Sequence, residues 1–115
     1  MTMAKFDSNT PILLAESDPE IQKAFQPILD EFQIHNLTIE EDGYEVLRND
    51  HATNFELIIL GSSLAGVGAS KVVAALRSDD NNKKTPILFM HSAADKESAE
   101  RVMKAGATAA LQWPV

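Results

Sequence analysis

The chain has 115 residues, of which 44% are apolar and 23% charged, a balance that suits one small globular domain with a single core. It contains no cysteine, which excludes disulfides and thiol catalysis and agrees with the reducing cytoplasm where we expect the protein to work. No apolar run reaches the ~18 residues that a membrane span needs, and the N-terminal residues lack the apolar stretch of a secretory leader.

The net charge of −7 is unevenly distributed along the chain. Residues 1–56 carry 3 Lys/Arg and 12 Asp/Glu, whereas residues 57–115 carry 7 and 5. An acidic surface repels phosphate backbones, so we expect no nucleic-acid binding by this segment. The acidity either keeps the chain in solution or steers a basic partner towards it.

The first elements are read from apolar spacing and from helix-start signals. The unbroken apolar run at 11–15 predicts a strand buried on both faces. Asp18 and Pro19 predict the start of a helix, because Asp caps a helix well and Pro is favoured at its first position. Apolar residues then recur at helical spacing as far as Phe32. Alternation at 36–40 predicts a weak second strand.

The same reasoning places the later elements, with Gly106 expected to terminate the last helix. These are a turn at 42–43, a short helix from 44–48, a strand at 56–60, a loop at 61–68, a helix at 69–77, a loop at 79–84, a strand at 85–91, a helix at 95–105 and a strand at 109–113. Strands that alternate with helices imply right-handed crossovers and a parallel sheet. We therefore divide the chain into an N-terminal arm (1–10) and one α/β domain (11–115).

Several short motifs, in this order and spacing, resemble those of response-regulator receiver domains. They are Ile12-Leu-Leu-Ala-Glu-Ser-Asp-Pro19, Asp42-Gly-Tyr-Glu-Val-Leu47, Glu56-Leu-Ile-Ile-Leu60, Pro86-Ile-Leu-Phe-Met90, Lys104-Ala-Gly-Ala107 and Pro114. The resemblance runs almost without gaps from residue 11 to the last residue. It implies a doubly wound, flavodoxin-like sheet of five parallel strands in the order 2-1-3-4-5.

The same resemblance indicates that the phosphorylation site of such domains is degenerate here. The phosphoacceptor aspartate position falls on Gly61, the acidic pair on Glu16 and Ser17, and the lysine position on Trp113. The two switch positions fall on His91 and Ala110. Phosphotransfer to a carboxylate needs that aspartate and a divalent cation. We therefore expect neither phosphorylation nor a bound divalent cation at this site. Gly61 has no side chain to accept the phosphoryl group, and Glu16 alone is a weak ligand for a hard cation.

Individual residues of this pocket leave alternatives open. Ser62 and Ser63 are either a polar loop or surrogate acceptors, and a serine nucleophile would need a base, for which His91 is the nearby candidate. His91 is either a satisfied histidine at a strand end or a pH switch near neutrality. Trp113 either fills the space of the missing charged groups or is an exposed aromatic anchor for a partner.

The resemblance also implies a fifth helix, which this chain lacks after Pro114. Apolar surface of the first, third and fifth strands is therefore expected to be exposed. That surface would be covered by the N-terminal arm, by a second copy in a homodimer, or by a part of a larger protein.

These observations predict a bacterial, non-enzymatic signalling module of a two-component (phosphorelay) pathway, with no cofactor. It would act through phosphorylation-independent contacts with a signalling kinase, an output domain or a second copy, using the helix at 95–105 and the last two strands. The alternative is a sensor of a small ligand or anion in the vacated pocket. A hydrolase built on Ser62 and His91 lacks an acidic partner.

Overall fold

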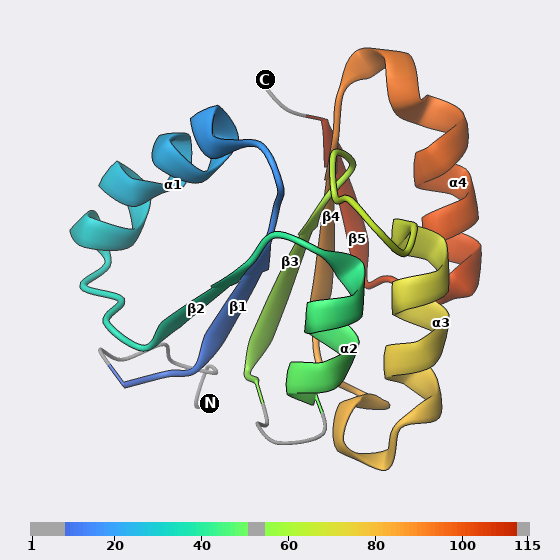
Figure 1. Cartoon of the computed structure of the whole chain (residues 1–115), viewed down its shortest axis with the longest axis horizontal. Coiled ribbons are helices and arrows are strands. Elements are labelled where there is room, and N and C mark those ends of the chain that lie inside the picture. Colours follow the sequence, from blue (N-terminus) through green and yellow to red (C-terminus); the bar gives the residue numbers. More distant parts are fainter. Residues whose placement is uncertain (1–8, 51–54, 113–115) are drawn as a thin grey trace, which may run out of the picture.

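Five parallel strands form the centre of the computed structural model, which describes residues 9–50 and 55–112, with the backbone alone at 49–50 (Figure 1). Their spatial order is β2-β1-β3-β4-β5. The strands are β1 (Ile12–Ala15), β2 (Leu37–Glu40), β3 (Leu57–Gly61), β4 (Ile87–His91) and β5 (Ala109–Gln112). This order confirms the doubly wound, flavodoxin-like fold expected from the sequence.

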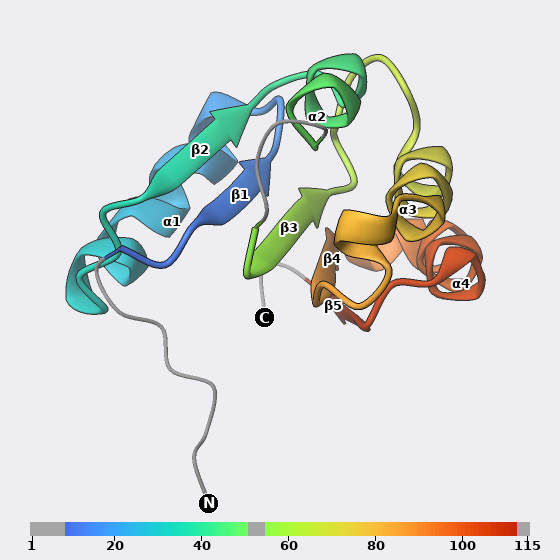
Figure 2. The same ribbon diagram turned by 90° about the horizontal axis from the view of Figure 1, so that it is seen from below.

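Helices cover the two faces of the sheet unequally. Figure 2 shows α1 on one face, with α2, α3 and α4 on the other. The helices are α1 (Pro19–Glu31), α2 (Gly43–Asp50), α3 (Ala69–Ser78) and α4 (Lys96–Ala105). A short 3-10 turn at Asp80–Asn82 precedes β4, where the sequence predicted only a loop. A second one at Ala93–Asp95 precedes α4, which the sequence predicted to begin at residue 95. Among the described helices, none is long and apolar enough to cross a membrane.

The predicted helix ends are confirmed by their capping contacts. The Asp18 side chain accepts a hydrogen bond from the Glu20 N–H (2.9 Å), and Pro19 occupies the first turn. Gly106 ends α4 with φ of +124°, a backbone conformation that favours glycine. A side chain there would also press on Arg77.

Two apolar clusters fill the space between the sheet and its two helix layers. The larger packs alternate strand residues such as Leu13, Ile58 and Phe89 against α2, α3 and α4. The smaller packs Ile12, Leu14, Ile59 and Met90 against Phe25 and Leu29 of α1. Because side chains alternate along a strand, every central strand is buried on both faces.

The prediction that strands one and three are exposed was wrong for most of their residues. Ile12, Leu14 and Ile59 are buried, because α1 lies over β1 and the adjoining half of β3. The prediction holds for β5, where all four residues are exposed, including Leu111. The uncovered part of the sheet is therefore the β5 edge rather than its centre.

Arg77, at the end of α3, ties together the connections that lead into β4 and β5. Its Nη1 donates to the carbonyls of Asn82 (2.9 Å) and Thr85 (2.7 Å). Its Nε donates to the Gly106 carbonyl (2.8 Å), and Nη2 reaches the Thr108 hydroxyl (3.3 Å). Burial lowers the pKa of this guanidinium. One side chain thus satisfies backbone acceptors from two loops.

Candidate functional site

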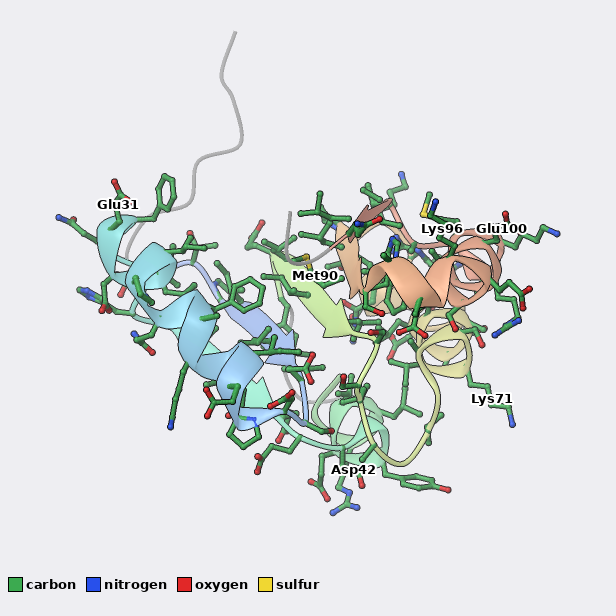
Figure 3. The ribbon with its side chains drawn as sticks, turned by 90° about the horizontal axis from the view of Figure 1, so that it is seen from above. Glu31, Asp42, Lys71, Met90, Lys96 and Glu100 are labelled. Atoms are coloured by element: carbon green, nitrogen blue, oxygen red, sulfur yellow. The ribbon has the colours of Figure 1, made fainter. Side chains whose placement is uncertain are left out.

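The carboxyl ends of β1, β3 and β4 lie side by side and bring three of the predicted site residues together. Glu16 follows β1, Gly61 ends β3 and His91 ends β4, and these strands are direct neighbours in the sheet. A small cavity of about 100 Å³ opens at this edge. It is lined by Glu16, Ile21, Ser62, Ser63, Met90, His91, Ser92 and Asp95. Met90 is labelled near the centre of Figure 3, at this end of the sheet.

Glu16 occupies the space that a side chain at position 61 would need. The Glu16 side chain is almost completely buried (1% exposed), and a Cβ atom placed on Gly61 would overlap its Oε1 and lie 2.7 Å from its Cδ. The other carboxylate oxygen, Oε2, accepts a hydrogen bond from the Asp18 N–H (2.8 Å). Gly61 is therefore the residue that lets the Glu16 carboxylate fold inward.

Burial raises the pKa of the Glu16 carboxyl above its ordinary value. The hydrogen bond from the Asp18 N–H acts in the opposite direction and favours the charged form, while the nearby Asp18 carboxylate again raises the pKa. Because burial is the largest cause, the net shift favours the protonated acid.

Ser17 connects three loops rather than lining the cavity. Its hydroxyl donates to the Glu41 carbonyl and accepts from the Ala65 N–H (2.7 Å). The Gly43 N–H also donates to the Ala65 carbonyl (2.8 Å). The loops after β1, β2 and β3 are thereby fastened to one another. Ser17 was among the residues predicted for the site. Glu41 and Ala65 were not, because they bond to Ser17 through backbone groups, which carry no side-chain signal.

The surroundings of His91 match a satisfied histidine at a strand end. It is 8% exposed, and its ring is stacked on Phe89 with centroids 5.8 Å apart. Nδ1 lies 2.8 Å from the Ser92 carbonyl, and a carbonyl can only accept, so Nδ1 carries the proton. The Ser92 hydroxyl does not bond to this ring, because it donates to the Asp95 carboxylate (3.2 Å).

The remaining predicted site residues are divided between the cavity lining, the exposed last strand and the part of the chain outside the described residues. Ala110 pairs with Phe89 in the sheet and is exposed on β5, and it does not line the cavity. Trp113 lies outside the described residues. Ser62 and Ser63 do line the cavity. No hydrogen bond joins either of them to His91 in the described structure, so no serine–base pair is assembled there.

A divalent cation does not fit the side chains at this edge. Magnesium requires several oxygen ligands in octahedral geometry. Within residues 9–48 and 55–112, no group of three or more acidic, histidine or cysteine side chains could hold a metal ion. One Glu16 oxygen is already bound to the Asp18 amide, and Gly61 has no side chain. We therefore derive no chemistry through a metal here.

This sheet order, with side chains converging at the carboxyl ends of its strands, defines a doubly wound α/β domain of the flavodoxin-like class. The response regulator receiver domain family matches residues 12–115. The chain belongs to this family, whose members serve in two-component signalling.

Solved receiver structures share the fold at low sequence identity. The receiver domain of the sensor histidine kinase PA1611 from Pseudomonas aeruginosa, which holds a magnesium ion in its active-site cleft, superposes with a TM-score of 0.83 at 21% identity, covering 93% of this chain and 87% of that one. The chemotaxis response regulator CheY4 of Vibrio cholerae gives 0.81 at 23%, covering 92% and 88%. A histidine-kinase receiver domain from Syntrophus aciditrophicus gives 0.81 at 20%, covering 92% and 80%.

Proposed function

We propose that this receiver domain signals through protein contacts without being phosphorylated and without enzymatic activity. The observation that carries the proposal is the pairing of Glu16 with Gly61. The position expected to hold the acceptor carboxylate has no side chain, and the Glu16 carboxyl fills the space beside it. Phosphotransfer to a carboxylate needs an exposed nucleophile and a cation beside it. The described residues offer neither at this edge.

Mass measurement after treatment with a small phosphodonor tests this proposal. We expect the native chain to gain no phosphoryl adduct under conditions that modify a phosphorylatable receiver domain treated in parallel. The companion variant, Gly61→Asp with Glu16→Asp, adds one carboxylate at position 61 and shortens the Glu16 side chain that fills its space. A phosphoryl adduct on the native chain would contradict the proposal, whichever residue carried it.

The surface that we propose for partner contact is formed by α4 and β5. Met103 and Leu111 are 40% and 42% exposed, and the rest of β5 is exposed as well. Exposed apolar side chains beside a free strand edge are typical of protein interfaces. The partner is a signalling kinase, an output domain or a second copy of the chain. The second copy is tested by sedimentation at tens of micromolar, where Leu111→Glu should abolish any dimer formed through this edge.

The alternative function is a sensor that binds a small ligand or anion at the cavity between Glu16 and His91. The cavity favours this alternative because it combines three hydroxyls with an imidazole. It opposes an anion because Glu16 and Asp95 also line it, and about 100 Å³ accommodates little more than a few water molecules. Titration of Trp113 fluorescence with inorganic phosphate discriminates, since only the sensor predicts a saturable change.

A further inference from the structure

A second cavity, of about 210 Å³, lies between α3 and α4. These two helices lie side by side on the face of the sheet that three helices cover (Figures 1 and 2). Both helices lie entirely within the described part of the chain. Phe89 and Val102, which belong to the larger apolar cluster, form part of the cavity wall. The cavity is therefore built into the packed side of the domain.

Four polar side chains line this cavity, and they come from three separate segments. Ser62 belongs to the loop after β3, and Ser70 to the first turn of α3. Ser98 and Arg101 are one turn apart on α4. The three serines are half-buried, whereas Arg101 is exposed. Three hydroxyls and one guanidinium thus surround one space.

These polar groups retain hydrogen-bond donors for a ligand. The Arg101 Nη2 donates to the Ser98 hydroxyl (3.3 Å), so the guanidinium already lies against this wall of the cavity. Among the described residues, no carboxylate lies within salt-bridge distance of Arg101. The Ser62 and Ser70 hydroxyls form no hydrogen bond with any residue that the structure describes. Because a guanidinium carries several N–H donors and no acceptor, the site suits an anion.

The charges around the cavity also favour an anion. Of the described residues that line it, none is acidic, whereas Glu16 and Asp95 line the smaller cavity. The first turn of α3 contains no acidic residue either. Glu97 and Glu100, the acidic residues of α4, are exposed and do not line the cavity. An anion would therefore meet a positive charge and hydroxyls in this wall, with no carboxylate among them.

The volume and the placement of the donors indicate the class of anion. At about 30 Å³ for each water molecule in the liquid, the cavity has space for about seven of them. That space holds a phosphate group and leaves room for a small organic group. Donors that approach from three segments suit a tetrahedral oxyanion better than a flat carboxylate. A guanidinium also pairs with phosphate through two parallel hydrogen bonds.

We propose that this cavity reversibly binds a phosphate group, held by the Arg101 guanidinium and the hydroxyls of Ser62, Ser70 and Ser98. The ligand is inorganic phosphate or a small phosphate monoester. Since Ser98 and Arg101 belong to α4, a bound phosphate would fasten α4 to α3 beside the surface proposed for partner contact. The inference is independent of the phosphorylation-free function proposed above, because no phosphoryl group is transferred.

Titration of the isotope-labelled full chain, followed by amide chemical shifts, tests the proposal at constant ionic strength. The probes are inorganic phosphate, glycerol phosphate and, as the flat anion, acetate. We expect saturable shifts centred on the amides of Ser70 and Arg101 with both phosphates, and binding of acetate at least about tenfold weaker. Tighter binding of glycerol phosphate would support the proposal and indicate a phosphorylated metabolite. Equal binding of the two phosphates would support it with free phosphate as the ligand.

Matched variants locate the bound phosphate. Arg101→Gln should weaken binding by at least about tenfold, and Ser98→Ala by about threefold. Lys71→Gln removes the same charge from an exposed residue of α3 that does not line the cavity, so it should weaken binding by less than about twofold (Figure 3). Ser63→Ala changes a residue that lines only the smaller cavity, and it should have no effect.

Three results would overturn the proposal. The first is the absence of saturable shifts with either phosphate. The second is an equal loss of binding in Arg101→Gln and Lys71→Gln, which would show a diffuse attraction to surface charge rather than a site. The third is a set of shifts centred on His91 that Ser63→Ala abolishes, which would place the anion in the smaller cavity.

Discussion

Glu16 and Gly61 depend on each other, because one buried side chain takes the volume that the other position leaves free. Gly61→Ala should therefore destabilise the chain by about 1–3 kcal/mol, the usual cost of overpacking. In a Glu16→Ala background the same change should cost much less, which gives a coupling energy of about 1 kcal/mol or more. Urea unfolding of the four chains measures this. Gly68→Ser, where no atom lies within 4 Å of the added Cβ, is the matched control. A coupling energy near zero would show that the two residues are independent.

The buried Glu16 carboxyl also makes stability depend on pH. Burial raises its pKa in the folded chain above the ordinary 4.5, so the folded state holds the proton more tightly than the unfolded state. The stability that this group contributes is fully present below the unfolded pKa and is lost as the pH rises through the folded pKa.

Glu16→Gln cannot lose a proton and should escape that loss. Its free energy of unfolding should rise relative to that of the native chain as the pH increases above 4.5, the ordinary pKa of the carboxyl, as followed by urea unfolding at several pH values. Glu100→Gln, on the exposed side of α4, should keep the native profile. If the difference in unfolding free energy between Glu16→Gln and the native chain did not change with pH, burial would not raise the pKa of Glu16.

At the scale of elements, local signals predicted each helix and strand, but not which surfaces they cover. Asp18-Pro19 and Gly106 marked helix ends correctly, because capping is decided by neighbouring residues. The coverage of β1 by α1 was missed, since it depends on how the helix lies across the sheet. The inward fold of Glu16 was missed for the same reason. The sequence showed both Glu16 and Gly61 at the site, but the contact between them joins residues 45 positions apart.

Arg77 illustrates how one residue fastens several elements together. Arg77→Ala would leave the carbonyls of Asn82, Thr85 and Gly106 without their donor, and it should cost about 2–4 kcal/mol of unfolding free energy. Arg77→Lys should recover only part, because a lysine cannot reproduce the planar fork. Arg101→Ala removes an exposed arginine that donates to the Ser98 hydroxyl, and it should change stability by less than about 0.5 kcal/mol. Equal effects at the two arginines in thermal or urea unfolding would contradict this assignment.

Across the whole molecule, the two helix layers differ in how firmly they are attached to the sheet. Helix α1 buries only Phe25 and Leu29, while the shorter α3 buries Val72, Val73 and Leu76 within the larger cluster. Local opening costs less where fewer apolar contacts are broken. Native-state hydrogen exchange should therefore show α1 amides exchanging at least about tenfold faster than those of α3.

The comparison of the two helices within one experiment supplies its own control, because amides of α1 and α3 exchange under the same conditions. If α1 exchanged as slowly as α3, the unequal attachment of the two helix layers to the sheet would be refuted.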